Sequence, residues 1–169
     1  MRVSPVLLTT ILLLIPSLSS AQLSTTPGYT KFDQQQFAKL RASVGTWKCV
    51  DVPASRKPDV QTTKQMGNYF VTRESGDDPS IAYTRWSTSY RMYYTVSMDD
   101  SGGTQVYMTK GLEPFNSTWT EVYPARTPDG KSFFPTFVTM HGNAIISSGR
   151  FYDDKGRVRY GRSTCTKIG

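Results

Sequence analysis

The chain has 169 residues, of which 37% are hydrophobic and 12% are aromatic, and its formal net charge at pH 7 is +7. This length suits one domain with a sizeable core, and a basic domain can meet nucleic acid, an anionic polysaccharide or a membrane surface, although such a charge often serves solubility alone. No stretch approaches the roughly 20 apolar residues of a comfortable transmembrane helix, which argues against a helical integral membrane protein.

The first segment, residues 1–21, has the features of a secretory signal peptide. Arg2 supplies a short positive region, residues 6–15 are almost wholly apolar, and small residues precede the expected cleavage site before Gln22. We therefore expect export to a periplasmic or extracellular compartment, with a retained membrane anchor as the alternative. Removal of the segment leaves a formal charge of +6, because Arg2 is its only charged residue.

The next segment, residues 22–30, is rich in Ser, Thr, Pro and Gly, and we expect a flexible leader before a domain over 31–169. Thr30 can cap a helix, with Asp33 three residues on, and the pattern predicts one short amphipathic helix through about Arg41. Apolar residues follow at helical spacing: Phe37, Leu40 and Val44.

From Gly45 onward, runs rich in Tyr, Thr, Val, Ile and Phe alternate with turn residues, which is typical of strands joined by hairpins. The predicted strands are Gly45–Val52, Val60–Met66, Tyr69–Glu74, Ile81–Trp86, Ser89–Met98, Gln105–Lys110, Thr118–Tyr123, Phe133–Met140, Ala144–Tyr152 and Arg157–Lys167. About ten strands in meander order predict an all-β, antiparallel up-and-down barrel, and a two-sheet sandwich is the main alternative.

The clearest alternation lies in the predicted strand 89–98, where aromatic residues and Met share one face that we expect to point inward. With residues of other strands, this face would line a cavity for a small ligand. The predicted cavity residues are Trp47, Tyr69, Tyr90, Met92, Tyr94, Met98 and Met108. The alternative is that these bulky side chains fill the barrel.

Two cysteines in an exported chain favour one disulfide bond. Cys49 lies in the first predicted strand and Cys165 in the last, and these strands are neighbours when a sheet closes into a barrel. Two free buried thiols are the alternative.

The opening Gly45-x-Trp47 after a short helix resembles the lipocalin and fatty-acid-binding superfamily. With Cys49 after Trp47 and a Cys late in the last strand, the chain is most similar, over about residues 37–167, to a bacterial family of exported lipocalin-like domains of unknown function. This resemblance implies a closed barrel with an interior cavity and implies no reaction.

The chain is also similar to the haem-binding nitrobindin barrels, in which a late His holds the iron. His141 is the only His here, and its surroundings are typical of a turn, so an exposed turn histidine is the alternative to haem ligation. We expect no other cofactor. The acidic doublets, such as Asp99-Asp100, fit ordinary turns better than calcium loops.

The C-terminal hairpin is strongly basic, and Arg157, Arg159 and Arg162 are its candidate binding residues for an acidic protein, glycan or nucleic acid. The alternative is a solvated outer face. Catalysis has little support, because there is no Gly-x-Ser-x-Gly elbow and no metal-ligand spacing of Cys and His. Asn116 begins a glycosylation acceptor sequence that matters only in a eukaryotic host.

The sequence therefore predicts an exported, monomeric barrel that holds a small apolar or amphipathic ligand without catalysis. A filled barrel that binds an acidic partner through its basic hairpin is the second hypothesis, and an enzyme or haem binder is a weaker third.

Overall fold

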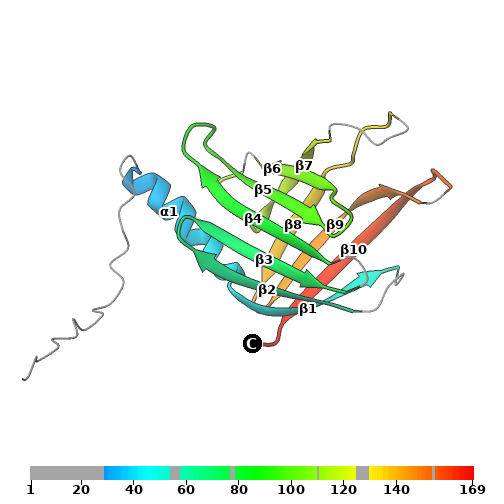
Figure 1. Ribbon diagram of the computed structural model, residues 1–169, viewed down its shortest axis with the longest axis horizontal. Helices are drawn as coiled ribbons and strands as arrows, with labels where there is room; N and C mark the ends of the chain where they lie inside the picture. Colours follow the sequence, from blue (N-terminus) through cyan, green and yellow to red (C-terminus); the bar gives the residue numbers. More distant parts are fainter. Residues whose placement is uncertain (1–28, 54–57, 77–78, 110, 125–129, 154) are drawn as a thin grey trace, which may run out of the picture.

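The computed structural model describes residues 29–53, 58–76, 79–109, 111–124, 130–153 and 155–169. These residues form a barrel with one short helix at one end (Figure 1). The helical elements are α1 (Lys31–Lys39) and the 3₁₀-helix η1 (Leu40–Ser43). The strands are β1 (Gly45–Val52), β2 (Asp59–Met66), β3 (Tyr69–Ser75), β4 (Ser80–Ser87), β5 (Met92–Asp99), β6 (Thr104–Thr109), β7 (Asn116–Tyr123), β8 (Thr136–His141), β9 (Ala144–Tyr152) and β10 (Val158–Lys167).

Each strand pairs antiparallel with its neighbours in sequence, and β1 pairs with both β2 and β10, so the sheet closes on itself. The predicted ten-stranded up-and-down barrel is therefore confirmed, and the alternative of two packed sheets is wrong. Closure leaves no unpaired edge strand in the ladder.

The helix begins as the sequence predicts. The backbone N–H of Asp33 donates to Thr30 Oγ1 at 3.2 Å, and the Thr30 N–H donates to Asp33 Oδ2 at 3.1 Å, which together form a capping box. After Lys39 the chain tightens into η1, so the helical segment ends near the predicted Arg41. None of the described residues belongs to a helix with the length and hydrophobicity to cross a bilayer.

A buried aromatic cluster closes the barrel at the helix end. Phe37 of α1 packs on Phe70 of β3 with ring centroids 5.0 Å apart, and Trp86 of β4 packs edge-on against Tyr93 of β5 at 4.9 Å. Trp119, which comes from the far strand β7, packs against the same cluster. Side chains from strands so far apart around the barrel can meet only inside it.

This cluster fixes which face of each strand points inward. Tyr93 is fully buried in the barrel, and successive side chains on a strand alternate, so Thr95 and Ser97 also point inward. The residues between them point outward: Met92, Tyr94, Val96 and Met98. The predicted orientation of this strand is therefore wrong, because the bulky apolar series covers the outside and the inside carries hydroxyl groups.

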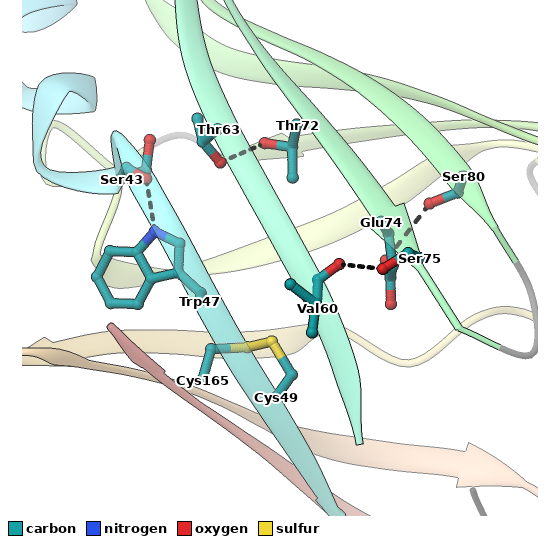
Figure 2. The surroundings of a disulfide bond; sticks show 10 residues. All are labelled: Ser43, Trp47, Cys49, Val60, Thr63, Thr72, Glu74, Ser75, Ser80 and Cys165. Carbon is teal, nitrogen blue, oxygen red and sulfur yellow. Dashed lines mark hydrogen bonds between the residues drawn. A yellow bond between two sulfur atoms is a disulfide. The ribbon is translucent and has the colours of Figure 1, made fainter. Parts of the chain in front are cut away.

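The disulfide joins the first and last strands as predicted. Cys49 and Cys165 lie directly opposite each other on β1 and β10 and are bonded across a sequence separation of 116 residues (Figure 2). Both are buried inside the barrel next to Trp47, whose indole N–H donates to the carbonyl of Ser43 at 2.8 Å. The alternative of free thiols does not apply.

Position 45, two residues before Trp47, favours glycine for a steric reason. Gly45 has a φ of 135°, in the region that favours glycine, and a Cβ atom there would lie 2.6 Å from the carbonyl oxygen of Gly169. The C-terminal residues cross this point, because the N–H of Thr46 donates to the same oxygen at 2.8 Å. The Gly-x-Trp sequence thus lets the end of the chain pack on the start of β1.

Candidate functional site

The barrel differs sharply between its two ends. The helix end is filled by the aromatic cluster and the disulfide. At the opposite end, the inward positions carry mainly small or polar residues, including Thr136 of β8, Ser147 and Gly149 of β9, and Gly161 of β10. This open end is where space for a ligand remains.

A pocket of about 320 Å³ lies at the open end, between β1, β8, β9 and β10. Two rows of inward residues form its floor, and each row follows the pairing of neighbouring strands. The rows are Asp51, Ser163 and Ser147, and then Gly161, Gly149 and Thr136. Phe151 also lines the pocket, and a Cβ at Gly161 would lie 3.0 Å from its ring, so the glycine leaves room for the phenyl group. The volume falls at the small end of the range for ligand pockets, roughly 300–1,000 Å³.

Charge is divided between the two faces of the barrel wall. Within the ten strands, every acidic residue belongs to the inward series, and all lie toward the open end: Asp51, Asp59, Glu74, Asp99 and Glu121. Six of the eight strand Lys and Arg residues belong to the outward series: Lys48, Lys64, Arg73, Arg85, Arg150 and Arg162. The inward surface of the open end is therefore acidic, and we call it the cup. The outward surface of the barrel is basic.

Carboxylates from neighbouring strands crowd the wall of the cup beside the pocket. Burial, together with the nearby carboxylate of Asp59, raises the pKa of Glu74 above its ordinary value. Ser80 donates to Glu74 Oε2 at 3.4 Å, whereas Asp59 Oδ1 is buried without a hydrogen-bond partner (Figure 2 shows Glu74 and Ser80). The repulsion between Asp59 and Glu74 makes further negative charge unfavourable here, and a bound cation would offset it.

A second carboxylate lies on the far side of the cup. Glu121 of β7 is paired in register with Tyr107 of β6, and its Oε1 atom is buried without a partner. Burial raises the pKa of Glu121 to about 7, and burial together with Glu121 raises the pKa of Tyr107 to about 12. Glu121 therefore changes charge near neutral pH.

Only one of the predicted cavity residues, Trp47, lies inside the barrel, and it belongs to the filled helix end. Tyr69 and Met108 belong to the outward series, as do Met92, Tyr94 and Met98. Tyr90 lies in the turn between β4 and β5 with 71% of its surface exposed, because the strand begins at Met92 and not at Ser89. The prediction that these residues line one cavity is wrong.

The residues that do line the pocket, chiefly Asp51, Ser147 and Ser163, were not predicted from the sequence. One signal could have found them. Trp47 was expected inside, and alternation along the same strand places Cys49 and Asp51 inside as well.

The basic hairpin brings its arginines together around one acid. Arg157 Nη2 lies 2.9 Å and Arg159 Nε 3.1 Å from Asp153 Oδ2. Hydrogen bonds, first that from the backbone N–H of Arg157, hold the pKa of Asp153 well below its usual range. Arg162 is exposed and borders the pocket instead.

His141 ends β8 on the outward side, exposed, with Nε2 3.4 Å from Thr139 Oγ1. Elsewhere in the described ranges, no three His, Cys, Asp or Glu side chains come together in a group that could hold a metal ion.

Comparison with known proteins adds no relative: no protein-family model matches the chain, and neither does any curated protein.

Proposed function

We propose that the chain is a binding protein that holds a small polar ligand in the pocket at the open end of the barrel. The observation that supports this most strongly is the pocket of about 320 Å³ with a floor of hydroxyl groups and the carboxylate of Asp51. A pocket of this size suits a molecule with a handful of non-hydrogen atoms, and hydroxyl and carboxylate groups orient it by hydrogen bonds. The apolar ligand expected from the sequence fits the cup less well, because the apolar series lies outside.

The charge of the cup selects among polar ligands. Five carboxylates face the cup, and two of them have buried oxygens that lack partners. Asp51 is the carboxylate that lines the pocket; Arg150 and Arg162, from the outward series, also border it, and the inward Arg159 is paired with Asp153. A ligand with a protonated amine would offset this negative charge, whereas an anionic ligand would add to it. We therefore propose an amine-bearing ligand.

Export and membership of the exported lipocalin-like family belong to the same proposal. The disulfide between Cys49 and Cys165 supports an oxidising compartment, and the barrel opens with Gly45 and Trp47 on β1. Binding of an acidic partner by the basic hairpin stays a prediction, weakened by Asp153, which already offsets two of its arginines.

Calorimetric titration with three compounds of equal chain length tests the proposal: cadaverine, 1,5-pentanediol and glutarate. We expect cadaverine to bind most tightly and glutarate not to bind. The Asp51→Asn variant should weaken cadaverine binding by about tenfold, since a charge-assisted hydrogen bond is lost. Asp100→Asn, an exposed turn residue, serves as the matched control and should change nothing. Equal binding of all three compounds, or an Asp51→Asn variant that binds like the parent, would contradict the proposal.

A further inference from the structure

The outward surface of β3 to β6 carries a continuous apolar surface. Four residues lie opposite one another across these strands in a single row, Val71, Tyr83, Val96 and Val106, of which Val71 is buried and the other three are half-buried. The neighbouring row contains Tyr69, Arg85, Tyr94 and Met108. We call these eight residues the outer tyrosine patch. It includes three of the predicted cavity residues, Tyr69, Tyr94 and Met108.

Arg85 is the only charged residue of the outer tyrosine patch, and its guanidinium is held in place. Nη1 donates to the Tyr69 hydroxyl at 3.1 Å, Nη2 donates to the Tyr29 hydroxyl at 3.0 Å, and Nε donates to the Trp86 carbonyl at 3.3 Å. The guanidinium also lies 5.1 Å and 5.9 Å from the ring centroids of Tyr69 and Tyr94. A rigid guanidinium loses little further freedom when it binds an anion.

The hydrogen bonds leave this group ready to donate more. Two of the five N–H groups of Arg85 have no partner among the described residues. The Tyr69 hydroxyl, which accepts from Arg85, is also hydrogen-bonded to Tyr94. None of the described carboxylates forms an ion pair with Arg85. A planar carboxylate can accept two parallel bonds from a guanidinium with free N–H groups.

The charges around the patch decide what kind of partner fits. The outward positions of β2 to β6 carry Lys64 and Arg73 as well as Arg85, and no acidic residue. A second copy of the chain docked patch to patch would bring two Arg85 side chains together without a counter-charge, which is unfavourable. An acidic protein segment would meet the opposite charge.

We propose that the outer tyrosine patch is a docking site for a partner protein's segment in which one carboxylate is flanked by apolar side chains. The carboxylate binds Arg85, and the apolar side chains lie over Tyr83, Val96 and Met108. This site lies on the opposite side of the barrel wall from the pocket, so it does not depend on the ligand proposed above.

Nuclear magnetic resonance titration with two matched peptides tests this docking site. The probes are the capped tripeptides Phe-Glu-Phe and Phe-Gln-Phe, which differ only in the charge of the central side chain. We expect the acidic peptide to shift the methyl signal of Met108 saturably, and the amide peptide to bind about tenfold more weakly. The signals of Met140, which lies inside the barrel at the helix end, should not move.

Variants separate the role of Arg85 from general basic charge. Arg85→Gln and Arg85→Lys should both weaken the acidic peptide about tenfold, because Lys keeps the charge but lacks the planar fork. Arg73→Gln removes an outward arginine that lies one row outside the outer tyrosine patch, and it should change the affinity for the acidic peptide less than twofold. A urea unfolding curve for each variant shows that the barrel remains folded.

Three results would overturn the proposal: equal affinity for the two peptides, an Arg85→Gln variant that binds the acidic peptide like the parent, or no shift of Met108. Binding to vesicles of equal parts phosphatidylcholine and phosphatidylglycerol that depends on Arg85, without peptide binding, would assign the patch to a membrane surface and would also overturn it.

Discussion

Trp86 donates its indole N–H to Asp33 Oδ1 at 2.7 Å, and this bond ties the inside of β4 to the first turn of α1. Asp33 also caps the helix through Thr30, so one buried carboxylate serves both the helix start and the closure of the barrel end. Hydrogen bonds from Thr30 and then Trp86 lower the pKa of Asp33, which keeps it charged at neutral pH.

Replacing this carboxylate should cost much of the stability of the domain. Asp33→Ala removes the cap and leaves the Trp86 N–H unpaired, so we expect a loss of about 2–4 kcal/mol in the free energy of unfolding, measured by urea denaturation. The contribution should vanish at acid pH, because a group with a lowered pKa loses its stabilising effect as the pH falls through that pKa. Gln34→Ala, at an exposed position of the same helix, is the control and should change the value by less than about 0.5 kcal/mol.

The orientation of β5 can be tested with two adjacent tyrosines. Tyr93 is fully buried and donates to the Gln36 carbonyl at 3.0 Å, so Tyr93→Ala should lower the free energy of unfolding by about 3–5 kcal/mol. Tyr94 lies on the outside, and Tyr94→Ala should cost less than about 1 kcal/mol. The reverse order of these two losses would mean that the strand faces the other way.

The disulfide should be a major source of stability, because it closes a long loop. A Cys49→Ser, Cys165→Ser double variant should unfold at lower urea concentration, with a loss of about 4–5 kcal/mol in the chain-entropy model. The parent protein treated with a thiol reductant should show the same loss, and its mass should rise by two hydrogens. A parent whose mass does not change on reduction would rule out the bond.

Glu121 gives the protein a pH dependence of stability opposite in sign to that of Asp33. Its pKa is raised to about 7 by burial, so the native state binds more protons than the unfolded state between about pH 4.5 and pH 7, and stability falls as the pH rises through this range. Glu121→Gln should therefore be more stable than the parent by about 1–2 kcal/mol near pH 8, allowing for water in the open end. Urea denaturation at the two ends of the range measures this, and a gain that is equal near pH 4 and pH 8 would show that Glu121 does not titrate as described.

The sequence predicted the connectivity of the fold well, because the signals for it are local. Turn residues separated the strands, the capping residues Thr30 and Asp33 marked the start of the helix, and a cysteine in each of the first and last strands pointed to closure. Each of these features depends on a few neighbouring residues. All three are confirmed.

The interior was predicted less well, because alternation along a strand shows two faces and does not say which one is inside. On β5 the sequence predicts that the face with the aromatic residues and Met points inward. The structure reverses it, since Tyr93 is held by α1 and Thr95 and Ser97 follow it into the cup. The helix α1 fixes which face of β5 points inward, because the Tyr93 hydroxyl donates to the carbonyl of Gln36. These two residues are 57 positions apart in the sequence.

Native mass spectrometry of the protein, purified gently from the cells that make it, tests the central claim most directly. We expect a bound small molecule whose mass suits a pocket of about 320 Å³, and we expect it to be lost from a Ser163→Phe variant in which the pocket floor is filled. A Thr166→Phe variant, changed at an exposed outward position of the same strand, should keep it. A parent protein without a bound molecule that also fails to take up added cadaverine would contradict the account.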